Sequence, residues 1–216
     1  MKNMLFIMNP KAGRTTLKNS LVDVLEVFCN NDYAVRTYLT KSADDAERIV
    51  QEEGANYDVI VCAGGDGTLG NTVTGYMKSG IRVPLGYIPC GSTNDFARSM
   101  DIPRETVEAA EMIVKAEPFS IDIGSLNDKN FVYVAAFGMF SDTSYATPQN
   151  MKNIFGHAAY VLQGIKSLAN VPSYKMKVTI DGDEQEGEFI FGMVSNSVSV
   201  GGFKSITRKG VEFDDG

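Results

Sequence analysis

The feature that most constrains the fold is the apolar run Val-Ile-Val-Cys-Ala at residues 59–63, which is followed at once by Gly64-Gly65-Asp66-Gly67. A strand that is apolar at every position is buried on both faces, which is typical of parallel sheets covered by helices on both sides. Glycines at the end of such a strand let the chain turn sharply into a helix. The sequence therefore favours an α/β fold built on a parallel sheet.

The first 120 residues alternate between strand-like and helix-like patterns. Continuous apolar runs predict buried strands, and apolar residues at helical spacing predict amphipathic helices between them. We therefore predict a first domain over residues 1–120, with a doubly wound, mainly parallel sheet and helices on both faces. The expected strands are residues 4–8, 34–39, 58–63 and 83–89, and the expected helices are residues 17–28, 43–50, 68–78, a short one within 92–100, and 105–116.

The pattern changes near Pro118, where a second domain is expected over residues 121–216. Residues 119–126 and 130–140 predict strands, and residues 174–196 predict a β-hairpin with Asp181-Gly182 as its turn. One helix is expected at residues 151–169. We expect a mainly antiparallel, sandwich-like domain that is incomplete, because so few strands are small for independent stability. The natural protein is therefore expected to continue beyond Gly216.

Composition excludes several classes of protein. The formal charge of −7 argues against non-specific binding of nucleic acid. No apolar run approaches the ~20 residues that a membrane-spanning helix needs. The cysteines, Cys29, Cys62 and Cys90, are widely spaced and form neither a disulfide framework nor a zinc pattern. The sequence therefore predicts a cytoplasmic protein.

Three predicted strands end in loops of small and polar residues, and each loop precedes a helix. Ligands of open parallel sheets bind at the carboxyl ends of the strands. Helix N-termini and glycine-exposed N–H groups attract phosphate there. Ordinary βα turns also contain glycines and N-cap residues, but three such loops on one edge favour a phosphate-bearing ligand. Thr68, Ser92 and Thr93 are candidate N-caps or hydroxyl donors. The loops are Asn9-Pro10-Lys11-Ala12-Gly13, Gly64-Gly65-Asp66-Gly67-Thr68 and Cys90-Gly91-Ser92-Thr93-Asn94-Asp95.

The second loop contains a literal G-x-G-x-x-G from Gly65 to Gly70, which is the dinucleotide fingerprint. Two observations argue against NAD. Asp66 would repel a pyrophosphate unless a divalent cation lay between them, and the usual position of the ribose-binding acid reads Thr40-Lys41. A Walker P-loop does not occur in the chain. We therefore predict Mg²⁺-ATP as the ligand, because Mg²⁺ is held by few carboxylates together with substrate phosphates.

The segments "NPKAG", "GGDGT" and "IPCGSTNDFAR", in this order and at roughly this spacing, resemble the soluble bacterial diacylglycerol kinases. These belong to the lipid-kinase group that includes sphingosine and ceramide kinases. GGDGT is shared with NAD kinases and phosphofructokinase relatives, whereas "GSTNDFAR" favours the diacylglycerol branch. "IDIG", "SYATP", "FGHAAYVLQGIKSL", "GGF" and "DDG" extend the resemblance over the whole chain. The resemblance implies a transferase of phospholipid metabolism that uses ATP to convert diacylglycerol to phosphatidic acid, in a cleft between two domains.

Residue by residue, the resemblance implies a nucleotide site and a metal site. Asp66 is the predicted catalytic residue, beside the metal–phosphate network. Asp215 and the backbone carbonyl of Glu212 are the predicted ligands of a structural Mg²⁺. The predicted nucleotide-binding residues are Asn9, Pro10, Lys11, Ala12, Gly13, Thr40, Gly65, Asp66, Gly67, Thr68, Leu69, Gly70, Asn71 and Ser92.

The sequence departs from the family pattern in two ways. Asn71 stands where the family usually has glutamate, which puts any charge-dependent role at this position in doubt. The family's proposed general base is a glutamate in a later D-G-E segment, so we expect it beyond Gly216 and expect this chain by itself to be inactive. Two alternatives stay open: a kinase with a soluble acceptor, such as an NAD-kinase-like enzyme, and a nucleotide-binding protein without catalysis.

A lipid substrate implies contact with a membrane surface. The helix expected at residues 151–169 and the basic segment 204–209 are candidate surfaces, although such a stripe is more typical of core packing and such a cluster of a solvated face. We expect a protein that associates peripherally with the inner face of the membrane and binds no nucleic acid. A homodimer is compatible with the sequence, which leaves the oligomeric state open.

Overall fold

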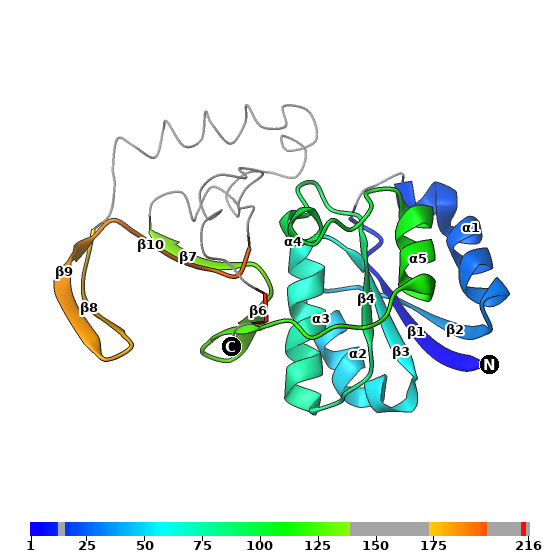
Figure 1. Ribbon diagram of the computed structural model, residues 1–216, viewed down its shortest axis with the longest axis horizontal. Coiled ribbons are helices and arrows are strands. Elements are labelled where there is room, and N and C mark those ends of the chain that lie inside the picture. Colours follow the sequence, from blue (N-terminus) through cyan, green and yellow to red (C-terminus); the bar gives the residue numbers. More distant parts are fainter. Residues whose placement is uncertain (13–15, 139–172, 198–212, 215–216) are drawn as a thin grey trace. The chain divides into compact units, whose positions relative to one another are not determined.

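The computed structural model describes residues 1–12, 16–138, 173–197 and 213–214. The chain divides into two compact units, one formed by Met1–Val134 with Ser195–Gly216 and the other by Ala135–Val194. The helices and strands of the described residues, most of them labelled in Figure 1, are β1 (Lys2–Met8), α1 (Thr16–Asn30), β2 (Tyr33–Leu39), α2 (Asp45–Glu53), the 3₁₀ turn η1 (Gly54–Asn56), β3 (Val59–Gly64), α3 (Asp66–Ser79), β4 (Leu85–Pro89), α4 (Asp95–Ser99), α5 (Thr106–Lys115), β5 (Gly124–Leu126), β6 (Lys129–Phe131), β7 (Val134–Gly138), β8 (Tyr174–Ile180), β9 (Asp183–Phe189) and β10 (Phe191–Ser195).

The first unit is built on a four-stranded parallel sheet in the order β2-β1-β3-β4. The register pairs Met8 with Leu39 and with Ala63, and Gly64 with Pro89, so the four strands end at one edge. Residues 59–64 are buried throughout, as the apolar run predicts. The predicted mainly parallel, doubly wound sheet is therefore confirmed.

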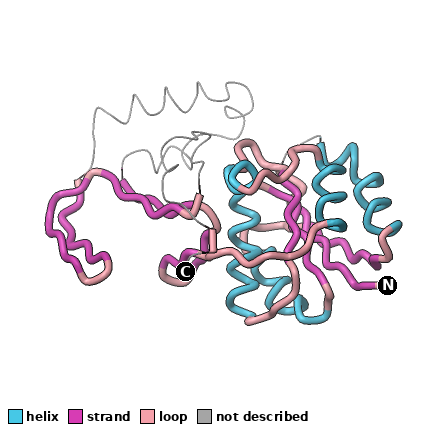
Figure 2. The backbone as a smooth tube through the Cα atoms, viewed as in Figure 1, coloured by secondary structure: helices cyan, strands magenta, loops and turns pink. Residues whose placement is uncertain are grey.

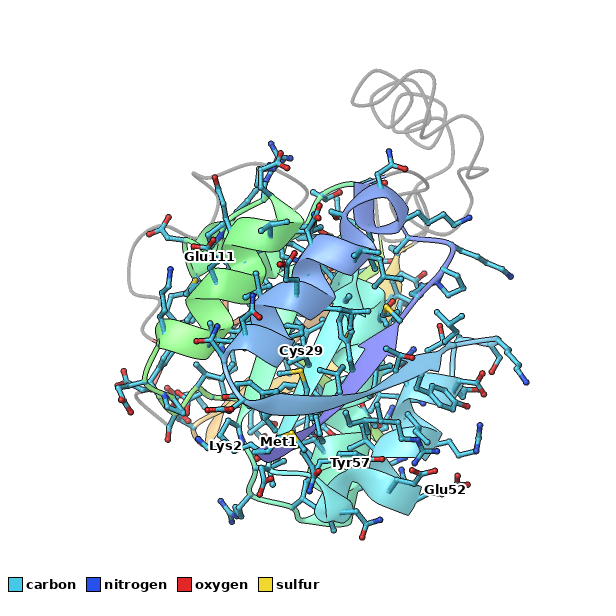
Figure 3. The ribbon with its side chains drawn as sticks, turned by 90° about the vertical axis from the view of Figure 1, so that its right-hand side faces the viewer. Met1, Lys2, Cys29, Glu52, Tyr57 and Glu111 are labelled. Atoms are coloured by element: carbon cyan, nitrogen blue, oxygen red, sulfur yellow. The ribbon has the colours of Figure 1, made fainter. Side chains whose placement is uncertain are left out.

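Side chains alternate between two cores along the central strands. Met4, Phe6 and Met8 of β1 pack in the core under α1 and α5. Leu5 and Ile7, the residues between them, pack under α2. Figure 3 shows α1 and α5 next to each other over one face of the sheet, and α2 contacts α3. Because β1 and β3 carry large apolar residues on both faces, each helix layer has a surface on which to bury its apolar stripe.

The helices adopt their positions because their apolar residues recur at helical spacing. On α1, Leu17, Val24 and Phe28 fall on one face and are buried. The packing of α2 against α3 also depends on Gly75, because a Cβ atom there would lie 2.4 Å from the backbone oxygen of Glu47. Helix α3, which follows the glycine-rich loop, is therefore held closely between β3 and α2.

The segment after α5 differs in part from the sequence-based expectation. A strand was expected at residues 119–126, but only Gly124–Leu126 is a strand, paired antiparallel with β6. Ile121 and Ile123 instead pack on the core beside α3 and α4. The backbone of Asp122 bonds to other partners, with its N–H donating to Phe213 O at 2.7 Å and its oxygen accepting from the Asn196 side chain at 2.7 Å. These contacts satisfy the backbone without a sheet ladder.

The second unit contains the β7–β10 pair and the antiparallel β8–β9 hairpin (Figure 2). Asp181 and Gly182 form the two-residue turn with φ of 52° and 93°, as the Asp-Gly pair predicts. The antiparallel C-terminal strands agree with the predicted fold class. The helix expected at residues 151–169 and the basic segment 204–209 lie outside the described residues. The predicted domain boundary at residue 120 stays a prediction.

Candidate functional site

The candidate site lies at the carboxyl edge of the parallel sheet. Strand β1 leads into α1 on one face of the sheet, and its neighbour β3 leads into α3 on the other face. The chain therefore leaves these adjacent strands in opposite directions, which creates the crevice where ligands of open α/β sheets bind. Residues 9–12 follow β1, and Gly65 with the first turn of α3 follows β3, so two of the three predicted loops flank this crevice.

Asn9 joins the loop after β1 to the loop after β3. Its Nδ2 donates to Oγ1 of Thr68 at 3.0 Å, and its Oδ1 accepts from the backbone N–H of Lys11 at 2.9 Å. Its own N–H donates to the oxygen of Ala63 at 3.0 Å, which extends the strand pairing by one residue. The Nδ2 of Asn9 thus joins the two loops, while its Oδ1 fixes the loop after β1.

The start of α3 is open to a ligand. Its N-cap is Gly65, which provides no side-chain cap, and the next glycine, Gly67, is exposed. A Cβ atom on Gly67 would have no neighbour within 4 Å. The first turn of a helix presents N–H groups that lack intrahelical partners and carries a partial positive charge. This position therefore suits an anionic ligand group.

Asp66 connects α3 to α4. Its Oδ2 accepts from the N–H of Asp95 at 3.1 Å and its Oδ1 accepts from the N–H of Phe96 at 3.1 Å, so its carboxylate lies at the start of α4. Burial raises the pKa of Asp66 above its ordinary value, and the two N–H donors act in the opposite direction. The aspartate between the glycines thus has a partner within the protein, at the positive end of a short helix.

The loops after β3 and β4 touch through their backbones. A Cβ atom on Gly91 would lie 2.6 Å from the Cα of Gly65, so neither glycine tolerates a side chain without a shift. Asn94, with φ of 53°, closes the β4 loop on itself, since its Oδ1 accepts from Gly91 N–H at 2.8 Å and its Nδ2 donates to Gly91 O at 3.0 Å. Below them, the buried hydroxyl of Tyr87 donates to Gly64 O at 3.1 Å.

Sequence reasoning did not identify Tyr87 or Asn94. For Asn94 a signal existed, because asparagine before a helix tolerates left-handed geometry. Tyr87 lies within an apolar strand, where nothing in the sequence marks its hydroxyl as a partner of a glycine loop. The N-cap role expected for Thr68, Ser92 or Thr93 is wrong, since the N-caps of α3 and α4 are Gly65 and Asn94. Their alternative role as hydroxyl donors to a ligand stays a prediction.

A fourth segment, residues 40–44, completes the edge. Thr40 is buried, and its N–H donates to Met8 O at 2.9 Å. The carboxylate of Asp45 accepts from the N–H of Lys41 at 2.6 Å, and this bond is the main cause that lowers the pKa of Asp45. From α3, the side chain of Asn71 donates to the oxygen of Ala43 at 2.8 Å. The segment is therefore held at its beginning, middle and end.

Most of the predicted nucleotide-binding residues come together at this edge. Gly13 lies outside the described residues, as do the predicted metal ligands Glu212 and Asp215. Ser92 is exposed on the β4 loop. In the part of the chain that the structure describes, no three His, Cys, Asp or Glu residues gather as a metal site would require. Among the same residues, no helix has the length and apolar character needed to cross a membrane.

The fold and this edge define an α/β protein with glycine-rich loops of the phosphate-binding kind at a topological switch point. The diacylglycerol kinase catalytic domain family matches residues 3–126, which is more than half of the chain. The chain therefore belongs to this family of kinases, which are transferases.

Relatives and solved structures agree with this assignment. A diacylglycerol kinase of Bacillus subtilis (strain 168) is 36% identical over 208 residues, covering 95% of this chain and 69% of the relative. One of Staphylococcus aureus (strain NCTC 8325 / PS 47) is 33% identical over 219 residues, covering 100% of this chain and 68% of the relative. The crystal structure of a diacylglycerol kinase from Bacillus anthracis str. Sterne matches all of this chain and 71% of its own, with 30% identity and a TM-score of 0.81.

Proposed function

We propose that the protein transfers the γ-phosphate of ATP to the hydroxyl of diacylglycerol and so produces phosphatidic acid. The observation that carries this proposal is the open start of α3 at the switch-point crevice, in a chain of the diacylglycerol kinase family. Phosphoryl transfer requires in-line positioning and neutralisation of charge around the γ-phosphate more than covalent help from the protein. Glycine-rich loops at helix N-termini supply both.

In this proposal the loops divide the nucleotide between them. The N–H groups of Gly65 and Gly67 bind the phosphates, because the N–H of Thr68 already donates to Gly65 O at 2.9 Å. Residues 9–12 lie on the opposite side of the crevice. Thr40 lies nearer the nucleoside, because the end of the second strand lies near the ribose in doubly wound folds. The remaining predicted residues, Leu69, Gly70, Asn71 and Ser92, line or support the same edge.

A magnesium ion bound with the nucleotide would neutralise phosphate charge and polarise the γ-phosphoryl group. Asp66 could interact with such a magnesium ion in one way, through the water molecules bound to the ion. Each oxygen of its carboxylate already accepts one N–H donor and keeps further lone-pair capacity. Asp66 therefore suits a role as acceptor for the water molecules of a hydrated Mg²⁺, which keeps several of its waters. Its main contribution is to hold α3 and α4 in place around the phosphates.

Because the acceptor, diacylglycerol, resides in the bilayer, the protein would associate peripherally with the inner face of the membrane. ATP and the lipid are then the only partners that the reaction needs. A homodimer stays a prediction that size-exclusion chromatography with light scattering checks.

The test is transfer of labelled phosphate from [γ-³²P]ATP with Mg²⁺ to diacylglycerol in mixed micelles, by a chain that also carries the later D-G-E segment in which the general base is expected. Labelled phosphatidic acid, absent when Asp66→Asn replaces the wild-type chain, supports the proposal. In parallel, isothermal titration calorimetry measures binding of MgATP. Label on a soluble acceptor such as NAD, with none on lipid, identifies the enzyme as a different kinase. Tight MgATP binding without label on any acceptor, from a panel that includes sphingolipids, contradicts the proposed activity and supports a binding protein.

A further inference from the structure

Asn71 contacts a part of the edge that is separate from the phosphate loops. It lies in the second turn of α3, half-buried, and its Nδ2 lies 2.8 Å from the backbone oxygen of Ala43. A carbonyl oxygen only accepts, so the atom that faces it must be a donor. The amide supplies that donor, whereas an aspartate or glutamate at the same position would place a second acceptor against the carbonyl. The structure thus gives a reason for an amide at residue 71.

In the contacted segment, residues 40–44, Thr40 is buried and Asp44 Oδ1 lies 3.8 Å from Nζ of Lys129, but the other side chains do not anchor the segment. Lys41, Ser42, Ala43 and Asp44 are all exposed. The backbone is held at Thr40, whose N–H donates to Met8 O, and at Lys41 and Ser42, whose N–H groups donate to the carboxylate of Asp45. After these points, the bond from Asn71 fixes the carbonyl of Ala43. Without it, an exposed loop of small and polar residues loses its tie to α3.

The location of the segment indicates which part of a ligand it serves. It follows β2, whereas the phosphate loops follow β1 and β3. In doubly wound folds, phosphates bind at helix N-termini near the switch point, and the ribose lies over the end of the second strand. Because α3 begins at the phosphate loop and reaches residues 40–44 through Asn71, the side chain links the two halves of a nucleotide site.

We infer that Asn71 is a positioning residue for the nucleoside half of the ligand, acting through the segment 40–44 and not on the phosphates. The inference rests on the proposed nucleotide site. It predicts that loss of the amide weakens ligands that carry a nucleoside and leaves a bare polyphosphate unaffected. If the contact only supported the fold, its loss would change the affinities for the nucleotide and for the polyphosphate equally, or would change neither affinity.

The experiment titrates two ligands, MgADP and Mg²⁺-tripolyphosphate, into each variant by isothermal titration calorimetry. Asn71→Ala removes the bond and should weaken MgADP about fivefold, as expected for one neutral hydrogen bond. Asn71→Asp replaces the donor by a charged acceptor near Asp44 and Asp45 and should weaken MgADP about tenfold or more. Tripolyphosphate should bind Asn71→Ala within about twofold of wild type, the usual scatter of a surface substitution. The added charge of Asn71→Asp also repels tripolyphosphate, so for this variant the expected result is a larger loss for MgADP than for tripolyphosphate.

The chain offers a matched control. The Nδ2 of Asn31 donates to the backbone oxygen of Val27 at 2.8 Å, the same distance as in the bond from Asn71. This bond is exposed and lies just after the end of α1, away from the site. Asn31→Asp removes the same kind of bond and should change neither affinity. Thermal unfolding of every variant verifies that the fold is intact.

Three results overturn the inference. Equal weakening of both ligands would mean that Asn71 acts on the phosphate loop. Unchanged MgADP affinity in folded Asn71→Ala and Asn71→Asp would mean that the bond has no part in binding. If wild type binds neither ligand, the proposed nucleotide site itself fails, and the wild-type titration identifies that case separately.

Discussion

Replacing Gly67 with alanine should leave the fold intact, or slightly more stable, while removing most of the affinity for MgATP. Gly67 has ordinary helical geometry in the first turn of α3 and is exposed. A Cβ atom there would meet nothing within 4 Å, so the added methyl group creates no clash inside the protein. Any penalty must therefore come from the ligand.

The expected effects of Gly67→Ala on stability and on MgATP affinity are opposite in sign. Alanine in place of glycine in a helix stabilises by about 0.5–1 kcal/mol, because the unfolded chain loses conformational freedom. For a chain of this size, 1 kcal/mol corresponds to a rise of about 2–4 °C in the melting temperature. The methyl group occupies the space through which a phosphate approaches the helix N–H groups. Loss of one hydrogen bond to a charged group is about 1.5–3 kcal/mol, which weakens MgATP about ten- to a hundredfold.

Gly91→Ala provides the contrast, because its Cβ atom would lie 2.6 Å from the Cα of Gly65 and 2.7 Å from Oδ1 of Asn94. The backbone loops after β3 and β4 would have to separate, and such overpacking typically destabilises by about 1–3 kcal/mol. This variant should therefore lose both thermal stability and affinity, since the loop that holds the phosphates moves.

The assay combines differential scanning fluorimetry with calorimetric titration of MgATP for wild type, Gly67→Ala and Gly91→Ala. The reasoning is refuted if Gly67→Ala folds normally and binds MgATP with wild-type affinity. In that case no phosphate comes close to the start of α3, and the open helix terminus is only an ordinary βα turn.

Two further predictions concern ionisation and thiol reactivity. Burial raises the folded-state pKa of Asp66 above its ordinary 3.8, so its contribution to stability is full at low pH and declines as the pH rises through the raised pKa. The stability of wild type relative to Asp66→Asn, measured by urea unfolding, should therefore fall as the pH increases from about 4; a difference that rises with pH would contradict the raised value. Burial also raises the pKa of Cys62 and of Cys90 to about 12, whereas Cys29 is exposed (Figure 3). Ellman's reagent at pH 8 should therefore react with one thiol in the folded chain and with three in denaturant, and rapid reaction of a second thiol in the folded chain would contradict the burial.

The sequence predicted the parallel sheet well because strands buried on both faces carry an unambiguous signal. Residues 59–63 are apolar throughout, and the structure buries all of them. It predicted the positions of the loops for the same reason, since each follows such a strand. The structure of residues 119–126 was harder to predict. Ile121 and Ile123 alternate with polar residues as in a strand, but they pack on the core beside α3 and α4 without forming one. Periodicity reports which side chains are apolar and not which surface they bury.

The interactions that shape the candidate site could not be predicted, because they join residues far apart in the chain. The bond from Asp66 to Phe96 spans 30 positions, and the one from Asn9 to Thr68 spans 59. The sequence placed Asp66 beside a metal–phosphate network, which stays a prediction, and gave no sign that its carboxylate accepts from N–H groups at the start of α4. A local pattern identifies an ionisable residue at an edge, but the partner of its charge depends on tertiary packing.

The side chains at the start of α3 explain how this terminus stays available to a ligand. Asp66 reaches α4, Thr68 meets Asn9, and Asn71 holds Ala43, so each polar side chain is used on a neighbouring segment. The helical repeat of about 100° per residue directs Asp66 away from the side of Thr68 and Asn71. The N-cap Gly65 adds no side-chain cap of its own. The N–H groups of Thr68 and Leu69 donate to Gly65 O at 2.9 and 3.1 Å, so the donor that this fixed frame leaves for an anion is the one at the exposed Gly67.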